Sequence, residues 1–186
     1  GDPCVVVAGS PNVGKSALIT ALSTGEPEVA AYPFTTKRLH LGHFIHRRRK
    51  YQMVDTPGLL DRPNNERNQI EMQAIAALEN VGDIVLFLID PSESGGTPIQ
   101  EQMSLLREVK DLISARKIIL VHSKSDLDSK ESIPGAIMVS STKSTGLEEL
   151  REKVVHEIAA DAIVDPLQLP EGWHREDTEI KEHSLD

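Results

Sequence analysis

The stretch GSPNVGKS, residues 9–16, sets two glycines, a lysine and a serine at fixed distances from one another. The β-branched run VVVA (5–8) comes directly before it and predicts a strand buried on both faces of a parallel sheet. Residues 15–23 come next and carry apolar side chains at helical spacing. A GxxxxGKS loop between a buried strand and a helix is typical of a phosphate-binding loop.

The residue types of this loop each have a physical reason to face phosphate. Gly9 and Gly14 permit tight turns and let bare N–H groups approach an anion at the positive end of the following helix. Lys15 is expected to reach β- and γ-phosphate oxygens, and Ser16 to place its hydroxyl on Mg²⁺. The expected phosphate-side contacts are Gly9, Ser10, Pro11, Asn12, Val13, Gly14, Lys15, Ser16 and Ala17.

The rest of the chain alternates strands with helices. Buried strands are expected at IVLFLID (84–90), KIILVH (117–122) and AIMVS (136–140), and helices at 66–80, 98–113 and 147–163. After a polar loop, the runs LHLGHFI (39–45) and YQMVD (51–55) flank HRRRK (46–50) and predict a hairpin. This order predicts a three-layer α/β/α fold of the P-loop NTPase type, mostly parallel with one antiparallel hairpin edge strand.

Composition limits the class of protein. A chain of 186 residues fits one domain, here 1–163, followed by an acidic, proline-bearing tail or linker at 164–186. A formal net charge of −9 argues against a surface that wraps nucleic acid as a whole. No stretch has the roughly 18 to 20 apolar residues that cross a bilayer, so we expect a cytoplasmic protein with no membrane partner. We also expect a monomer. The single cysteine, Cys4, is expected to be a buried thiol.

Two further segments are expected to meet the γ-phosphate and the metal. DTPG (55–58) ends the second hairpin strand, where Asp55 can hold the Mg²⁺ shell through water and the Gly58 N–H can meet the γ-phosphate. YPFTTK (32–37) offers Thr35 and Thr36, one of whose hydroxyls can complete the coordination. Each motif alone is a turn signal, but their order after the loop predicts a metal site of Ser16, Thr36 and Asp55.

The segment SKSD (123–126) follows a predicted strand and is expected to select the base. A carboxylate at Asp126 can accept hydrogen bonds from guanine N1–H and the 2-amino group, which adenine cannot supply. Lys124 is expected to lie over the base plane, and the Ser141 N–H to meet guanine O6. The expected base-side contacts are Ser123, Lys124, Asp126, Ser140, Ser141 and Thr142.

Residues 4–163 together resemble a P-loop GTPase with a Ras-like G domain. The segments TPGLLDRP (56–63), ERNQIE (66–71), IDPSESGG (89–96) and YPFTTK resemble the nucleolar GTP-binding protein family, Obg-related GTPases of archaea and eukaryotes. The resemblance implies GTP and GDP as ligands, and GTP hydrolysis coupled to assembly of the large ribosomal subunit. It also implies a ribosomal precursor or ribosomal RNA as partner, a nucleolar location in a eukaryote, and helical N-terminal and further C-terminal regions that are missing here.

Four positions depart from the usual GTPase pattern or add to it. Ser123 replaces the asparagine of Asn-Lys-x-Asp, and Ser141 the alanine of the next motif; the shorter Ser123 predicts nucleotide retention weaker by about 1 to 2 kcal/mol. Leu59 stands where Ras-like enzymes orient water with glutamine, so slow intrinsic hydrolysis is expected. By resemblance Asn12 holds a K⁺ ion, unless it only stabilises the turn. The candidate catalytic residues are Lys15, Thr36, Gly58 and Asn12.

Other functions stay open at this point. A scaffold that binds nucleotide with little hydrolysis is compatible with Leu59 and Ser123, and a P-loop ATPase or kinase lacks a visible acceptor-site motif. The basic run RRRK (47–50) is either a solvated hairpin tip or an RNA contact. The seven histidines show no spacing typical of a zinc site.

Overall fold

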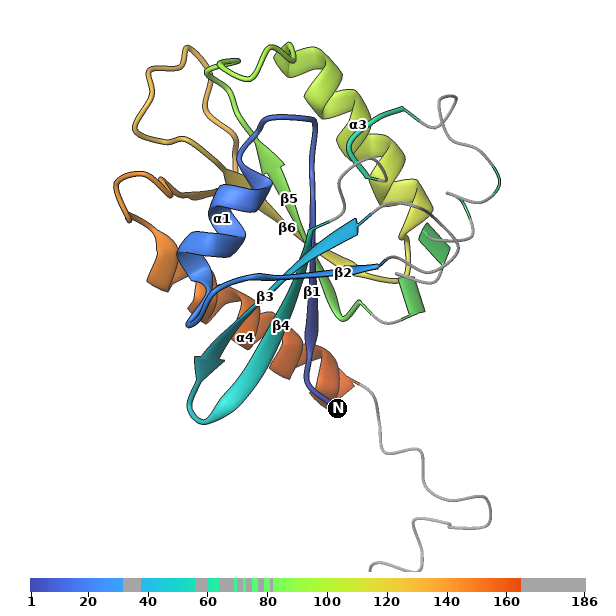
Figure 1. The fold of residues 1–186 in the computed structure, drawn as a ribbon. Helices are drawn as coiled ribbons and strands as arrows, with labels where there is room; N and C mark the ends of the chain where they lie inside the picture. The colour runs from blue at the N-terminus through green and yellow to red at the C-terminus, as the bar shows by residue number, and fades with distance from the viewer. Residues whose placement is uncertain are drawn as a thin grey trace, which may run out of the picture.

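The structure is a computed structural model that describes residues 1–31, 38–55, 60–63, 69, 72, 75–76, 79–80 and 82–164. These residues form a seven-stranded sheet covered by helices (Figure 1). The strands are β1 (Cys4–Ala8), β2 (Glu28–Ala31), β3 (Arg38–His46), β4 (Arg49–Asp55), β5 (Ile84–Ile89), β6 (Lys117–His122) and β7 (Ile137–Met138). The helices are α1 (Lys15–Leu22), α3 (Ile99–Leu112) and α4 (Leu147–Val164). The predicted α/β fold of the P-loop type is confirmed, whereas the helix expected at 66–80 lies largely outside the described residues.

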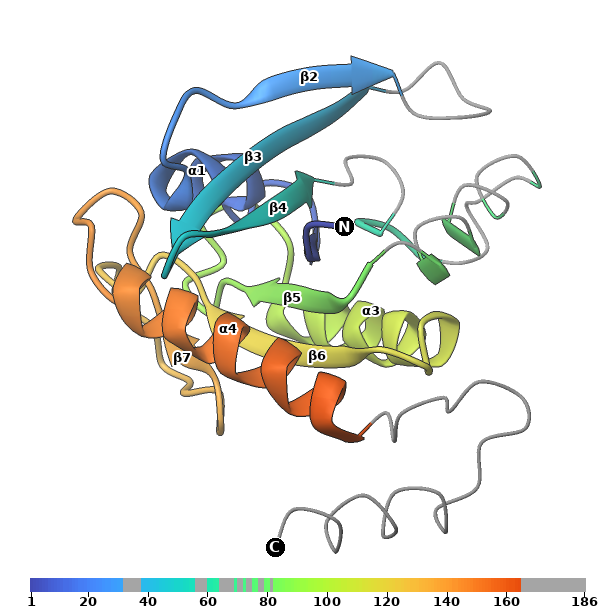
Figure 2. The same cartoon turned by 90° about the horizontal axis from the view of Figure 1, so that it is seen from below.

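β1 lies in the middle of the sheet, whose order is β2-β3-β4-β1-β5-β6-β7. It pairs in parallel with β4 on one side and with β5 on the other, and β6 and β7 continue in parallel. β3 runs antiparallel to both of its neighbours, β2 and β4. Figure 2 shows α3 and α4 on opposite faces of the sheet formed by β5 and β6. The chain leaves β1 toward one side of the sheet and later returns to the other side. Open α/β sheets bind ligands at the carboxyl end of the strand where this change occurs, and here that strand is β1.

Two strands differ from the sequence prediction. The segment Glu28–Ala31, predicted as a polar loop, is the edge strand β2, because it pairs along its length with β3. β3 is therefore one strand in from the edge. β7 is only Ile137–Met138, since the chain turns at Ser140, which forms an isolated bridge with Thr145.

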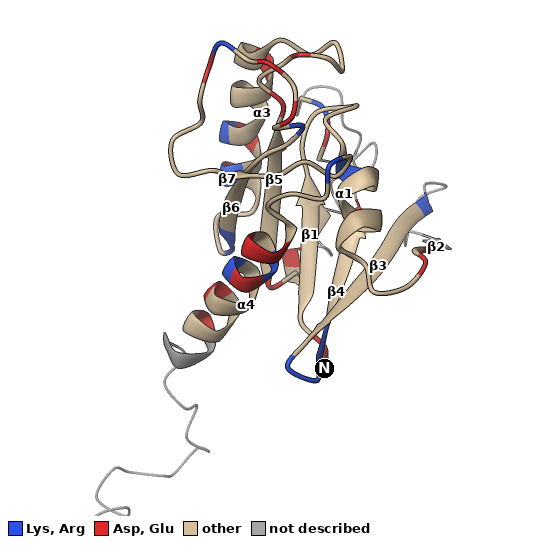
Figure 3. Ribbon diagram, turned by 90° about the vertical axis from the view of Figure 1, so that its left-hand side faces the viewer, with Lys and Arg blue, Asp and Glu red and all other residues tan. Residues whose placement is uncertain are grey.

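The hairpin turn is tighter than predicted. β3 extends to His46 and β4 begins at Arg49, so the turn consists of Arg47 and Arg48 alone. Their φ angles are 47° and 66°, and positive φ at both central residues is the geometry of a type I′ turn. Figure 3 shows this basic turn close to the N-terminus, at the end of the sheet where β1 begins. Arginine carries no turn signal, so the sequence alone predicts strands that are too short here.

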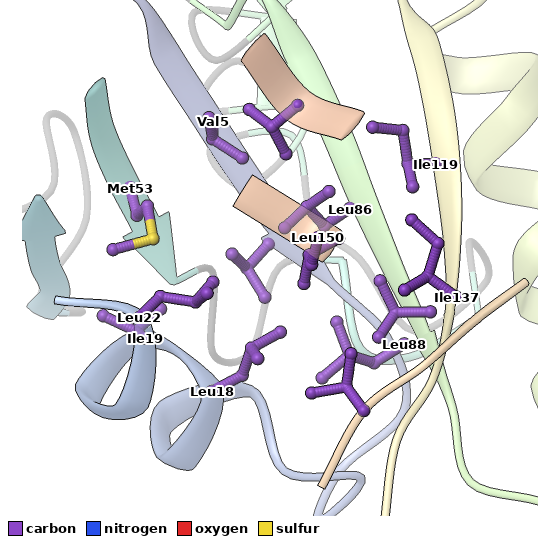
Figure 4. Close-up of a cluster of buried hydrophobic side chains, with 14 of the residues drawn as sticks. Val5, Leu18, Ile19, Leu22, Met53, Leu86, Leu88, Ile119, Ile137 and Leu150 are labelled. Carbon is purple, nitrogen blue, oxygen red and sulfur yellow. The ribbon is translucent and has the colours of Figure 1, made fainter. Parts of the chain in front are cut away.

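Alternate residues of β1 enter two hydrophobic cores, one on each face of the sheet. Val5 faces α1 and α4, where it joins a cluster that includes Leu18 and Leu150 (Figure 4). Val6 belongs to the second cluster, which includes Leu105 of α3. Burial on both faces explains why β1 is apolar throughout. In the described part of the chain, no helix is both long and apolar enough to span a bilayer.

Candidate nucleotide-binding site

The loop between β1 and α1 has the backbone geometry of a phosphate cradle. Gly9 and Gly14 have φ angles of 144° and 102°, which side chains rarely tolerate. A Cβ on Gly9 would lie 2.8 Å from the backbone oxygen of Leu88. Gly14 is the N-cap of α1 and provides no side-chain cap hydrogen bond. Since the first N–H groups of a helix have no intrahelical acceptor, an anion bound in the loop would cap α1.

Lys15 places its ammonium inside this loop. The side chain is buried, and Nζ donates to the backbone oxygens of Gly9 at 2.8 Å and Ser10 at 2.9 Å. Burial lowers the pKa of Lys15, while the charges of Asp61 and Asp55 act in the opposite direction. A buried ammonium is stabilised by an anion placed beside it, which a nucleotide phosphate supplies.

Ser16 and Asp55 meet where α1 begins and β4 ends. The Ser16 hydroxyl donates to Asp55 Oδ2 at 2.9 Å. Asp55 is 1% exposed, and its Oδ1 has no hydrogen-bond partner among the described residues. A buried carboxylate oxygen beside a hydroxyl fits the all-oxygen coordination of Mg²⁺, which also retains waters and phosphate oxygens. The residues present therefore fit the metal that the fold implies.

A hollow of about 440 Å³ opens over these groups. It is lined by Pro11, Asn12, Gly14, Lys15, Ser16, Ala17, Asp55 and Asp61. Val13 is buried beneath the loop. The predicted γ-phosphate contacts Thr35, Thr36 and Gly58, together with Leu59, lie outside the described residues.

The predicted base-side residues lie at the carboxyl ends of β6 and β7. Ser140 is buried and its hydroxyl donates to Asp126 Oδ1 at 2.8 Å, which orients the carboxylate. Asp126 itself is exposed, so a base can reach it. Ser141 and Thr142 belong to the turn after Ser140. Ser123 is buried, and its hydroxyl donates to the backbone oxygen of Ile89 at 3.2 Å.

Lys124 connects the base side with the phosphate side. Its ammonium donates to the backbone oxygen of Asn12 at 2.7 Å and to Ser94 Oγ at 2.9 Å. It also lies 3.2 Å from Asp90 Oδ2. The sequence predicted this lysine over the base plane, and the structure adds that its ammonium is bonded to the phosphate loop. The two halves of the predicted site are therefore joined by one side chain.

The loop after β5 belongs to the site and was missed by sequence reasoning. Asp90 is buried, which by itself raises the pKa, but hydrogen bonds from Ser92 and Lys124 hold the pKa of Asp90 below its usual range. A Cβ on Gly95 would collide with the backbone oxygen of Asn12. The signal in the sequence was IDPSESGG (89–96), an acidic residue at a strand end followed by a serine- and glycine-rich loop.

Comparison with known protein sequences gives a consistent set of relatives. The family model described as 50S ribosome-binding GTPase matches residues 4–124. A protein of Methanocaldococcus jannaschii, described as uncharacterized, is 50% identical over 131 residues, 70% of this chain and 36% of that protein. Nucleolar GTP-binding protein 1 of Saccharomyces cerevisiae is 34% identical over 180 residues, 88% of this chain and 28% of the yeast protein. The chain thus spans about a third or less of the length of these relatives.

Solved structures agree with the sequence comparisons. A crystal structure described as nucleolar GTP-binding protein 1 of Plasmodium falciparum matches with a TM-score of 0.77 at 28% identity, covering 99% of this chain and 94% of that chain. The G domain of the T. maritima FeoB iron transporter matches with a TM-score of 0.68 at 26% identity, covering 84% of this chain and 99% of that domain.

Proposed function

The chain belongs to the 50S ribosome-binding GTPase family and is related within it to the nucleolar GTP-binding proteins, and from this premise we propose that it acts as a Mg²⁺-dependent GTP switch in assembly of the large ribosomal subunit. The resemblance drawn from the sequence is confirmed, and the chain is a GTP-binding GTPase domain. Support for the ribosomal role comes from the names of its relatives, which mention the ribosome and the nucleolus. We assign the GTPase domain to residues 1–163, and name a ribosomal precursor or ribosomal RNA as the partner.

One observation carries the nucleotide assignment. The Lys124 ammonium donates a hydrogen bond to the backbone oxygen of Asn12 in the phosphate loop. Asp126, two residues further on, accepts a hydrogen bond from the Ser140 hydroxyl. A short segment therefore fixes the carboxylate that reads the base relative to the cradle that holds the phosphates. Such an arrangement fits a guanine nucleotide, because guanine alone of the two purines offers two adjacent donors to Asp126.

The residues of the loop would perform binding and charge stabilisation. Ser16 and Asp55 would hold Mg²⁺ together with Thr36, and the bound ion neutralises charge on the β- and γ-phosphate oxygens. Lys15 and the loop N–H groups would bind the same phosphates. Leu59 cannot orient the attacking water, so slow hydrolysis is expected without a partner. The K⁺ ion assigned to Asn12 stays a prediction, which hydrolysis rates in KCl and NaCl at equal ionic strength test.

Replacing Asp126 by asparagine tests the base assignment. Asp126→Asn replaces one of the two carboxylate oxygens by an amide donor, so the 2-amino group of guanine loses its acceptor while the C2 carbonyl of xanthine gains a donor. We expect GDP affinity to fall at least about tenfold and xanthosine diphosphate affinity to rise, because hydrogen bonds to a charged group contribute about 1.5 to 3 kcal/mol each. Titration of the Mg²⁺-loaded protein with fluorescent nucleotides measures both affinities.

The matched control is Asp128→Asn, which removes the same charge from an exposed carboxylate two residues away. This variant should bind GDP like the wild type. If Asp126→Asn kept its preference for guanine, or if ATP displaced GDP from the wild type, the guanine assignment would be wrong.

A further inference from the structure

The hairpin between β3 and β4 ends in a cluster of positive charge that the nucleotide site does not use. We call residues 47–50, RRRK, the basic turn. All four side chains are exposed, and within the described ranges none of them forms an ion pair or a side-chain hydrogen bond. In contrast, Lys117 pairs with both Glu157 and Asp161. On a chain of formal net charge −9, the basic turn is a local concentration of positive charge with which no acid of the described residues forms an ion pair.

Arg47 and Arg48 occupy turn positions whose backbone conformation disfavours arginine. Arg47 and Arg48 both have positive φ, a geometry for which type I′ turns favour asparagine and glycine. The strands on either side keep the hairpin closed, since Phe44 and Tyr51 pair across it with their rings stacked 5.0 Å apart. The Arg49 guanidinium lies 5.8 Å from the Tyr51 ring. Residues that break a local rule in a well-supported hairpin are characteristic of functional positions.

The position of the turn restricts what it can contact. It projects from the end of the sheet opposite to the phosphate loop (Figure 3). A hollow of about 770 Å³ between the turn and α4 is lined by Arg47 and, on the helix side, by Glu149, Glu152 and Lys153 among others. The acids and bases of this lining balance, so a polyanion gains more from the exposed outer side of the turn than from the hollow. A narrow basic projection also keeps the acidic remainder of the surface away from a bound polyanion.

We propose that the basic turn binds the phosphate backbone of double-helical RNA. Three of its four cations are arginines, whose planar guanidinium groups bind phosphate oxygens in pairs. An RNA duplex presents phosphates densely and is recognised through them and through its shape. An anionic membrane is disfavoured, because stable attachment needs an apolar or lipid anchor in addition to basic residues. This inference rests on the ribosomal RNA partner proposed above but not on GTP hydrolysis, since the turn and the nucleotide site lie at opposite ends of the sheet.

The double variant Arg47→Asn/Arg48→Gly tests the proposal without endangering the fold. Asn-Gly is the preferred sequence for a type I′ turn, so the hairpin should be at least as stable as in the wild type. RNA binding is measured by the fluorescence anisotropy of a labelled duplex of about 20 base pairs, long enough to span two successive minor grooves. The protein is loaded with Mg²⁺ and GDP, and the KCl concentration is varied. Removing two phosphate contacts should weaken binding and reduce the slope of log affinity against log salt by about two.

The matched control is Arg107→Gln/Lys110→Gln, which removes two exposed charges from α3. Loss of affinity and of salt slope in the turn variant, with both retained in the control, supports the proposal. Equal RNA binding by the wild type and the turn variant overturns it. So does a wild type that binds phosphatidylserine vesicles but no RNA duplex. GDP affinity of all three proteins is measured separately, so a failure of the nucleotide assignment is distinguishable from a failure of this one.

Discussion

Lys124 joins three segments of the chain through a single ammonium group. From the segment after β6, it donates hydrogen bonds to Asn12 of the phosphate loop and to Ser94 of the loop after β5, and it pairs with the buried carboxylate of Asp90 in that same loop. Hydrogen bonds of a charged donor are about twice as strong as neutral ones. The Ser123 hydroxyl, in contrast, donates a hydrogen bond to the backbone oxygen of Ile89, within the sheet. The connection between base side and phosphate side therefore rests on the lysine, and weaker nucleotide retention due to Ser123 stays a prediction.

The contacts of Lys124 could not be predicted from the sequence. The motif SKSD indicated the residue and its role near the base. Its bond to Asn12 depends on the left-handed backbone of Lys124, at φ 52°, and on Asp90 being held in place by Ser92. Lys124 and Asp90 come within reach of each other because β5 and β6 pair side by side, which no local pattern contains.

Cys4 provides a pH-dependent test of burial at one residue. Burial, and then the nearby charge of Asp83, raises the pKa of Cys4 to about 11. The folded protein therefore keeps the thiol proton to higher pH than the unfolded chain does. The resulting stabilisation is fully present below the ordinary thiol pKa of about 8.5 and is lost as the pH rises through the folded value.

We expect the free energy of unfolding of the wild type to fall, relative to Cys4→Ala, by an amount on the order of 2 kcal/mol between neutral pH and about pH 11. Urea titrations of both proteins at several pH values measure this difference. A difference that does not vary with pH would show that the thiol has an ordinary pKa.

Among the elements, the strands that form apolar runs were predictable and the edge strand β2 was not. β1, β5 and β6 each consist of an almost continuous apolar run, because both of their faces are covered. β7 was predicted from the apolar run at 136–140 and is shorter than expected. β2 carries no such run and becomes a strand through pairing with β3, a tertiary context that a local pattern does not contain.

Gly42 allows α1 to pack directly on β3. A Cβ at this position would collide with Ser23 Oγ and lie 2.7 Å from Ile19 Cγ2. We expect Gly42→Ala to lower the free energy of unfolding by about 1 to 3 kcal/mol, as overpacking in a dense core does. Urea denaturation measures the change.

Gly25→Ala is the control for this substitution. Its added Cβ would meet only His43 Cε1, at 3.9 Å, which is an ordinary contact. This variant should lie within about 0.5 kcal/mol of the wild type. Equal stability of the two variants would mean that α1 moves away from β3 without cost.

At the scale of the whole molecule, several predicted site residues lie at one edge of the sheet because their motifs follow strands. Asp55, Ser123 and Ser140 come directly after or near the carboxyl ends of β4, β6 and β7, which meet at one edge of the sheet. The positions of these motifs after parallel strands therefore predicted that their side chains lie close together. The loop after β5 escaped prediction because its serines and glycines have no recognised ligand chemistry of their own, and they act by supporting Lys124 and Asn12.

Nucleotide binding should stabilise the entire domain. A ligand that binds only the folded state at about 100 times its Kd adds about 2.7 kcal/mol, which raises the Tm of a domain of this size by roughly 5 to 10 °C. We expect this shift with GDP and Mg²⁺, and a smaller one after chelation of Mg²⁺ by EDTA. Differential scanning fluorimetry measures it, with ADP at the same concentration as the control. A Tm that does not change with GDP, or that rises equally with ADP, would contradict the assignment of a guanine nucleotide site.

β4 begins within the basic turn, at Arg49, and ends at Asp55. Its seven residues span about 20 Å, and an extended strand has almost no slack to lengthen. It is pinned between β3 and β1 along this length, and a slip by one residue would turn Asp55 toward the opposite face. A force that a bound partner exerts on the hairpin is therefore transmitted along β4 to Asp55, the carboxylate proposed to hold Mg²⁺.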